Sequence, residues 1–319
     1  MTSIGAIRYE FPAGTRSVRE LAATGLLEST AETLESLGFD QVRVACEESS
    51  YSLALAASTR LLEEAGIDRD SIGLIVYGGA PGGLAFAPAR TLTGAADDII
   101  SSARFRYPST RLQYDLGLER AAVLAVDQLA CTTLFGAVRV ARALCLAEGI
   151  ERALCVAADM YPPLAGREAL FNCTADAGCA VLVERDNPRN RIVGARTVTK
   201  GYYWNADTMR DEIVASYFPT ARHVIAETVR DAGWSSEDVD WVIPHNVSRR
   251  SWEILMGLVA LPRARLWADN IARDGHTLAG DNFINLHDAL SAGAITPGDR
   301  LLLFSYGYGA HWTALAVEA

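Results

Sequence analysis

A cysteine at the start of a predicted helix is the residue of this chain best suited to carry out chemistry. Cys131 lies between the apolar run 121–126 and the amphipathic stretch 134–147, in a strand, turn and helix pattern. The first turn of a helix presents unpaired N–H groups and partial positive charge, which favour a thiolate and can hold a developing oxyanion. Cys131 is therefore a candidate acyl-carrying nucleophile, although free cysteines also commonly pack as small buried hydrophobes.

Two histidines are the best candidates to assist such a nucleophile. His245 follows the apolar run 241–244, and His276 lies in the turn-like stretch 274–280. Both positions are in loops at the ends of regular elements, where functional residues concentrate. One histidine at such a place is more often structural. A cysteine and two histidines together indicate a catalytic set of Cys131, His245 and His276.

An internal repeat indicates that the chain contains two copies of one α/β module. The clearer internal similarity is between residues 65–76 and 232–243, which align without a gap as helix end, acidic turn and apolar strand. Residues 149–156 and 297–304 are more weakly similar, and in both a turn leads into an apolar strand.

The repeat predicts where the reactive residues meet. A polar, turn-rich stretch separates an N-terminal half, 1–185, which carries Cys131, from a C-terminal half, 186–319, which carries both histidines. In the repeat, the loop at Cys131 corresponds to the loop of His276, and the exit of the other repeated strand corresponds to His245. All three then lie near strand ends, where ligands bind in open α/β folds.

Composition excludes several classes of function. The 319 residues are 50% apolar and 21% charged, as in a globular protein, and we expect no transmembrane span and no signal peptide. The net charge of −10 argues against general nucleic-acid binding. The six cysteines lack C-x-x-C spacing, so we expect reduced thiols in the cytoplasm, no metal site and no cofactor. The glycine-rich turn 78–83 lacks Gly-Lys-Ser/Thr and is a poor phosphate loop.

Five short motifs occur in an order and spacing that resemble a known family. They are residues 130–131, 242–246 (Val-Ile-Pro-His-Asn), 274–277 (Asp-Gly-His-Thr), 295–303 and 306–312 (Tyr-Gly-Tyr-Gly-Ala-His-Trp). Each is unspecific alone. Together, over nearly the whole chain, they resemble the thiolase superfamily, and most of all the β-ketoacyl-acyl-carrier-protein synthase III group. The resemblance implies a thiolase-like, five-layered αβαβα fold of two pseudo-symmetric halves, and a homodimer.

The resemblance also implies roles for individual residues. Cys131 would be acylated from a coenzyme A or carrier-protein thioester, and His245 would activate it or bind the carbonyl of the second thioester. The backbone N–H groups of Cys131 and Tyr308 would form the oxyanion hole. Arg249 and Arg250 would contact the carrier or coenzyme A, although an ordinary solvated arginine pair explains them equally well.

The chain departs from the family pattern at two places that bear on the reaction. The position of His276 is usually Asn, so the site gains a second base that titrates near pH 7. Tyr308 replaces the middle residue of a usual Gly-Gly-Gly, which narrows the space above the nucleophile.

Three hypotheses therefore stay open. The leading one is decarboxylative Claisen condensation with a malonyl thioester, in specialised metabolism such as polyketide or fatty-acid biosynthesis. A Cys-His-His set resembles the elongating synthases, in which this condensation still takes place. The alternative is O- or N-acyl transfer without a new C–C bond, which the second base at His276 favours. The third is a non-enzymatic partner subunit with an inert Cys131.

Overall fold

The computed structural model describes residues 1–79, 106–162, 165–206 and 208–319. Residues 80–83 of the predicted glycine-rich turn lie outside these ranges.

The strands of the described residues form one large sheet and two small two-stranded sheets. The large sheet has the order β11-β12-β13-β10-β1-β9-β6-β4-β5. Its strands are β1 (Thr2–Glu10), β4 (Ile72–Gly79), β5 (Ala122–Val126), β6 (Arg152–Asp159), β9 (Ala177–Arg185), β10 (Arg191–Thr199), β11 (Trp241–Pro244), β12 (Arg300–Gly307) and β13 (His311–Glu318). The small sheets pair β2 (Gly14–Ser17) with β3 (Gln41–Val44), and β7 (Glu168–Ala169) with β8 (Asn172–Cys173).

Helices cover both faces of this sheet and fill the space between its two parts. They are α1 (Val18–Ala23), α2 (Ala31–Ser36), α3 (Ser50–Glu64), α4 (Pro108–Asp115), α5 (Thr133–Ala147), α6 (Arg210–Asp231), α7 (Arg249–Leu258), α8 (Asp269–Asp274) and α9 (Asp281–Ser291). Short 3₁₀ turns include η6 (Ala130–Thr132) and η10 (Leu278–Gly280), which lead into α5 and α9.

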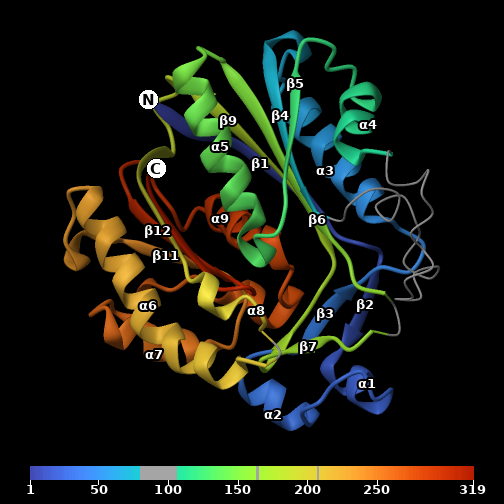
Figure 1. The fold of residues 1–319 in the computed structure, drawn as a ribbon, viewed down its shortest axis with the longest axis vertical. Coiled ribbons are helices and arrows are strands. Elements are labelled where there is room, and N and C mark those ends of the chain that lie inside the picture. Colours follow the sequence, from blue (N-terminus) through green and yellow to red (C-terminus); the bar gives the residue numbers. More distant parts are fainter. Residues whose placement is uncertain (80–105, 163–164, 207) are drawn as a thin grey trace.

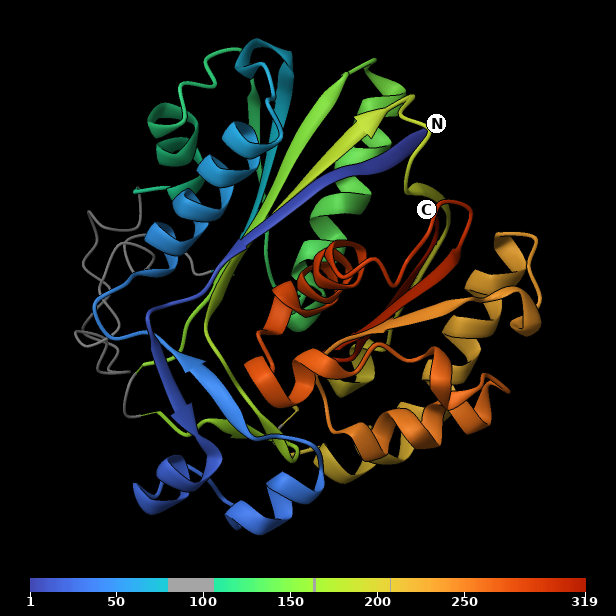
Figure 2. The same cartoon turned by 180° about the vertical axis from the view of Figure 1, so that it is seen from behind.

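The sheet consists of two parts that splay apart, joined where β1 meets β10. Only Ser3 and Arg191 are register partners across that junction. Figures 1 and 2 show α5 and α9 between the two parts, α3 and α4 outside the first part, and α6 and α7 outside the second. The order is therefore αβαβα, and the predicted five layers are confirmed.

Alternating side chains of the central strands explain this layering. In β6, Ala153, Cys155 and Ala157 belong to the apolar cluster around α5 and α9, whereas Leu154 and Val156 belong to the cluster under α3. In β12, Leu301 and Leu303 face inward, whereas Leu302 and Phe304 join the cluster under α6 and α7. Both faces of each strand are thus buried, as expected for near-continuous apolar runs.

The two parts of the sheet repeat one topology. In the first, β4 runs parallel to β6, and β6 pairs antiparallel with β9, which pairs antiparallel with β1. In the second, β11, β12, β13 and β10 follow the same sequence of pairings. The repeat also matches η6 and α5 with η10 and α9. The loops of Cys131 and His276 therefore approach the middle of the molecule from opposite halves.

Two details differ from the sequence prediction. An apolar run such as 121–126 is typical of a buried strand, but within the described residues β5 is the edge strand of the sheet, and Leu124 is 42% exposed. The sequence pattern predicts a helix over residues 286–292. The helix begins earlier, at Asp281, because the polar residues Asp281, Asn282 and Asn285 face the protein interior and interrupt the apolar pattern.

The six cysteines are free thiols, and the apolar helix that follows Cys131 is part of the protein core. All six cysteines are unpaired. Among the described residues, the stretch Ala130–Ala147 is long and apolar enough to cross a membrane, by length and composition alone. Its α5 portion supplies buried side chains to the cluster between the two parts of the sheet, so it is a core helix.

Candidate functional site

Cys131 lies in a tight turn between the edge strand β5 and helix α5. Gln128 and Ala130 both have positive φ, at 60° and 47°, a conformation uncommon for non-glycine residues and typical of functional turns. The hydroxyl of Thr132 donates to the Leu129 carbonyl (2.7 Å), and that of Thr133 donates to the Ala130 carbonyl (2.7 Å). These bonds close the turn and fix the cysteine at the start of the helix.

The end of β12, which belongs to the other half of the molecule, packs against this turn. The Ser305 hydroxyl donates to the carbonyl of Cys131 (3.3 Å). A Cβ atom at Gly307 would lie 2.2 Å from the Leu129 carbonyl oxygen, so only glycine fits there. The nucleophile of one half is thus held by a strand of the other.

His276 contacts the cysteine directly. Its Nε2 lies 3.2 Å from Cys131 Sγ, and its Nδ1 lies 2.5 Å from the Asp281 carboxylate. The backbone is also fixed, because its N–H donates to the Cys173 carbonyl and its own carbonyl accepts from Ala175 N (2.8 Å each). Cys131, His276 and Asp281 therefore form a continuous thiol–imidazole–carboxylate chain.

Asp281 is a fully buried carboxylate that accepts four hydrogen bonds. One oxygen accepts from the N–H and the hydroxyl of Thr277 (2.6 Å each). The other accepts from Asn246 N (2.6 Å) and faces His276 Nδ1. Because a carboxylate only accepts, Nδ1 of His276 carries the hydrogen and Nε2 is directed at the thiol.

His245 lies beside this chain without touching the cysteine. Its ring centroid is 6.2 Å from that of His276, and the ring packs against Trp252 and Phe304. Nδ1 faces the Phe304 carbonyl at 3.2 Å. A carbonyl only accepts, so Nδ1 donates. Nε2 is buried and has no partner among the described residues.

The two histidines have opposite electrostatic surroundings. Burial and the nearby charge of His276 lower the pKa of His245 to about 3, so its ring is neutral and Nε2 is a lone-pair acceptor. Burial also disfavours charge on His276, but the Asp281 carboxylate and Cys131 outweigh it and raise the pKa of His276 well above 6.5. A charged His276 next to Cys131 favours a thiolate–imidazolium pair.

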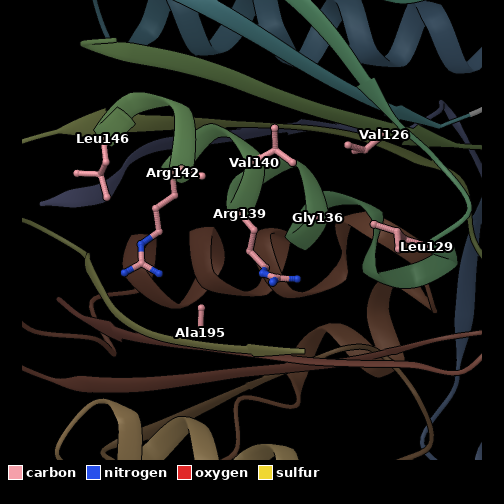
Figure 3. A pocket seen from close by; sticks show the side chains of 9 residues that line it. Val126, Leu129, Gly136, Arg139, Val140, Arg142, Leu146 and Ala195 are labelled. Carbon is pink, nitrogen blue, oxygen red and sulfur yellow. The ribbon is translucent and has the colours of Figure 1, made fainter. Parts of the chain in front are cut away.

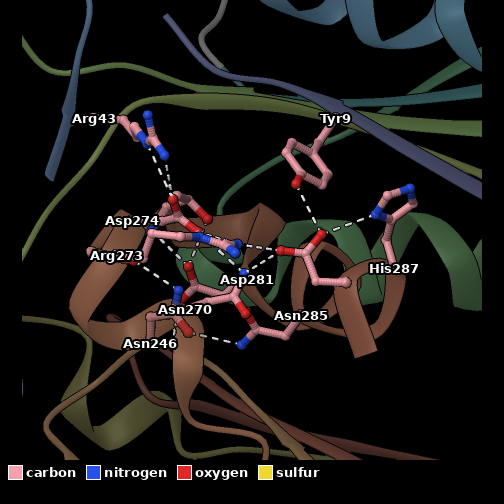
Figure 4. A network of polar contacts seen from close by, with 12 residues as sticks. Tyr9, Arg43, Asn246, Asn270, Arg273, Asp274, Asp281, Asn285 and His287 are labelled. Atoms are coloured by element: carbon pink, nitrogen blue, oxygen red, sulfur yellow. Dashed lines mark hydrogen bonds and ion pairs between the residues drawn. The ribbon is translucent and has the colours of Figure 1, made fainter. Parts of the chain in front are cut away.

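Amides from α9 hold the turn that carries His245 (Figure 4). Asn285 Nδ2 donates to the carbonyl of Pro244 and to the Asn246 side chain (2.8 Å each), and Asn246 Nδ2 donates to the Gly275 carbonyl (2.8 Å). The turns of His245 and His276 are thereby tied together.

The same network extends outward from the site. Asp274 accepts from Arg43 (2.8 Å) and from Arg273 (2.8 Å). Asp288 accepts from Tyr9 (2.9 Å) and pairs with Arg273. The polar network therefore connects the histidine turns with the first strand of the chain.

The structure brings together three of the predicted site residues and separates two from them. Cys131, His245 and His276 meet, and Tyr308 lines a pocket of about 470 Å³ together with Ala130, next to the cysteine. Arg249 and Arg250 are exposed at the start of α7, and no hydrogen bond or ion pair joins them to Cys131 or either histidine.

Asp281 was missed from the sequence. The signal was present, because an acidic residue follows His276 by five positions and begins a helix after a short turn. The predicted helix began at residue 286, which placed Asp281 in a loop with no assigned partner. Only the folded turn brings its carboxylate back to the imidazole.

Replacing Asp281 tests the chain of three groups. Asn at this position cannot accept from His276 Nδ1–H with its amide nitrogen, so we expect alkylation of Cys131 by iodoacetamide at pH 7 to slow by roughly tenfold, toward the rate of an ordinary thiol that is only a few per cent thiolate. Peptide mass spectrometry separates Cys131 from the exposed Cys46. Asp288→Asn, on the same helix, is the matched control and should react as the wild type does. Equal alkylation rates of Cys131 in the two variants would contradict the coupling of the thiol, the imidazole and the Asp281 carboxylate.

The low pKa of His245 predicts a pH dependence of stability. Between pH 6.5 and 3 the unfolded chain binds a proton at this residue and the folded chain does not, so stability falls as pH falls. From pH 6.5 to 5.0 the loss is about 2 kcal/mol. Urea unfolding of the wild type and of His245→Gln at both pH values measures it. The variant should lose less stability than the wild type, and an identical loss would refute the assignment.

Comparisons with known proteins agree with this geometry. Residues 229–319 match the family model "3-Oxoacyl-[acyl-carrier-protein (ACP)] synthase III C terminal". Beta-ketoacyl-[acyl-carrier-protein] synthase III 2 of Streptomyces coelicolor is 30% identical over 236 residues, which cover 66% of this chain and 68% of that protein.

Solved structures support the fold. The synthase III of Aquifex aeolicus superposes with a TM-score of 0.83 at 20% identity, over 100% of both chains. ChlB3, described as an acyltransferase, gives a TM-score of 0.84 at 21% identity and covers 100% of this chain and 97% of its own. These likenesses establish a thiolase-like fold, as predicted.

The curated relatives are enzymes, so the hypothesis of a non-enzymatic partner subunit is not retained. With a matching C-terminal family model and a relative aligned over most of its length, the chain belongs to the β-ketoacyl-[acyl-carrier-protein] synthase III family of the thiolase superfamily, whose members are condensing enzymes of the acyltransferase class.

Proposed function

We propose that this enzyme takes an acyl group from a thioester onto Cys131 and passes it to a hydroxyl or amine. The observation that carries the proposal is the chain from Cys131 Sγ through His276 to the buried Asp281 carboxylate. A thiol, an imidazole and a carboxylate in this order activate a nucleophile and then serve as general base for an acceptor.

In the first half-reaction the Cys131 thiolate attacks the thioester carbonyl. The tetrahedral intermediate collapses, and the C–S bond to the donor breaks. The proton held on His276 Nε2 goes to the leaving thiol, which leaves an acyl-cysteine and a neutral imidazole. The backbone N–H groups of Cys131 and Tyr308 are the proposed oxyanion hole. The positions of Tyr308 and Ala130 on one pocket wall support this role.

In the second half-reaction the neutral His276 accepts the proton of the attacking hydroxyl or amine. Asp281 stabilises the imidazolium that forms, and the Cys131 thiolate leaves. The neutral Nε2 of His245 is a further hydrogen-bond acceptor, suited to an O–H or N–H group.

Decarboxylative condensation with a malonyl thioester is the second candidate, and the names of the curated relatives favour it. In that reaction an enolate oxygen forms and needs hydrogen-bond donors. In the acyl-enzyme His276 has given its Nε2 proton to the leaving thiol, and His245 carries its hydrogen on Nδ1, so both histidines present a lone pair on Nε2. The site therefore offers two imidazole acceptors to a hydroxyl and no imidazole donor to an enolate.

We further propose that the acyl donor is a coenzyme A or carrier-protein thioester, in polyketide, fatty-acid or other specialised metabolism in the cytoplasm. Arg249 is exposed and forms no ion pair within the described residues, which leaves it available to a phosphate or an acidic carrier. Arg250 pairs with Glu253 (3.0 Å), so it is the weaker candidate.

A homodimer through the face around β5 also belongs to this proposal. Within the described residues β5 is an edge strand of the sheet, and it exposes Leu124. Beside it, Val126 and Leu146 line a groove of about 570 Å³ between α5 and β10, to which Arg139 and Arg142 also contribute (Figure 3). An exposed apolar strand next to such a groove is typical of a surface that a second copy covers.

The boundary between the halves remains a proposal at residues 185 and 186. It is supported by the position of the boundary between β9 and β10, at the point where the chain leaves one part of the sheet and enters the other.

The loading and transfer steps can be separated by intact-protein mass spectrometry. Incubation with a panel of acyl-coenzyme A and acyl-carrier thioesters should add one acyl mass to the wild type and none to Cys131→Ala. Addition of alcohols and amines should then remove the acyl mass and yield an ester or amide. Carbon dioxide release and a lengthened ketoacyl product with malonyl thioester would select the second candidate. No acyl adduct from any donor would refute the acyl-enzyme.

The dimer interface can be tested by light scattering after size exclusion. The wild type should have twice the mass of one chain, and Leu124→Lys should shift toward one chain because it places a charge in an apolar interface. Ile254→Lys on α7, a residue 39% exposed against 42% for Leu124, is the matched control and should remain dimeric. A monomeric wild type at tens of micromolar would contradict the proposal.

A further inference from the structure

Asp159 is an acidic residue beside the nucleophile that the proposed mechanism does not use. It ends β6 and lines the 470 Å³ pocket, together with Ala130 and Thr133 from the two sides of Cys131. The charge of the Cys131 thiolate raises the pKa of Tyr161 in the same wall, after burial itself, which places that phenol close to the thiolate.

Hydrogen bonds within the protein leave the Asp159 carboxyl incompletely satisfied. Among the described residues it accepts one bond, from Ala279 N to Oδ2 at 3.2 Å. A carboxylate has about four acceptor positions, so most of its capacity is not used by the described residues. Burial raises the pKa of Asp159 to about 6, although the Ala279 N–H and the nearby charge of His276 oppose the shift, so the carboxylate charge is poorly solvated.

The rest of the pocket wall is polar and rigid. Asp127, Gln128 and Tyr161 also line it, and none of its described lining residues is a lysine or arginine. Tyr161 is fixed because its N–H donates to Asp176 (2.9 Å), which forms a fully buried ion pair with Arg167 (2.9 Å). The Arg167 guanidinium is thus engaged and does not neutralise Asp159.

An occupant of this pocket must therefore bring hydrogen-bond donors. An aliphatic chain would strip water from the Asp159 carboxylate and return no hydrogen bond, which is unfavourable for a buried polar group. A carboxylate would add repulsion. A hydroxyl or an ammonium group would satisfy the free acceptor positions.

We propose that Asp159 determines the specificity of acyl loading, by accepting a hydrogen bond from a hydroxyl or ammonium group on the acyl chain carried by Cys131. The inference rests on the proposed acyl-enzyme and adds the class of acyl group. We place the acyl chain, and not the acceptor, in the pocket lined by Asp159. The acceptor would bind on the side of the general base His276 and the unpartnered Nε2 of His245, which both come from the C-terminal half.

Matched thioester pairs test the assignment. The pairs are butyryl- against 3-hydroxybutyryl-coenzyme A, and propionyl- against β-alanyl-coenzyme A. Loading of Cys131 is followed by intact-protein mass spectrometry. The wild type should load the polar member of at least one pair about tenfold faster or more. In Asp159→Asn, which keeps an oxygen for the Ala279 N–H, the preference should vanish, with loading of the aliphatic member unchanged or faster. The aliphatic rate is the internal control for folding.

The outcomes separate this inference from the function on which it rests. If no donor of the wider thioester panel loads Cys131, the acyl-enzyme itself fails; if other donors load and neither pair does, the proposed class of acyl group is refuted. If both members of both pairs load the wild type equally, the role of Asp159 is refuted whatever the variant does. A preference that persists in Asp159→Asn, or one that appears only in the transfer step, also overturns it.

Discussion

The buried carboxylate of Asp281 is the interaction on which the rest of the site depends. It accepts four hydrogen bonds, from both donors of Thr277, from the backbone of Asn246 and from His276. One group thereby closes the turn of His276, sets the tautomer of its ring and anchors the turn that follows His245. A buried charge is tolerated only when it is satisfied in this way. Loss of any of these hydrogen bonds would leave a buried charge unsatisfied, and this free-energy cost keeps the geometry of the site rigid.

The two halves of the chain are therefore interdependent at the candidate site. Cys131 comes from the first half, both histidines and Asp281 come from the second, and the end of β12 contacts the turn that holds the cysteine. The two apolar helices α5 and α9 pack between the halves and start at this point. Their N-termini bring the thiol and the carboxylate to opposite sides of one imidazole. The geometry of these groups is a consequence of how two copies of one module pack.

The opposite pKa shifts of the two histidines follow from the same arrangement. His276 lies between Asp281 and the thiol, so its charged form is stabilised despite burial. His245 is buried against Trp252 and Phe304 and lies near the charge of His276, so its neutral form is favoured. Two residues of one type thus differ in charge because their surroundings differ. Membership of a condensing-enzyme family does not by itself fix this division.

Much of the architecture was readable from the sequence. The apolar runs and the similarity of residues 65–76 to 232–243 predicted the strands, the repeat and the meeting of Cys131 with two histidines, because these patterns are local and periodic. The tertiary structure alone decided the rest. It placed Asp281 on His276, exposed β5 as an edge, and put Asp159 in the pocket wall. These contacts depend on the direction of side chains and on packing between segments that are distant in sequence. Hydrophobic periodicity predicts which positions are buried, but it does not predict which polar groups contact one another.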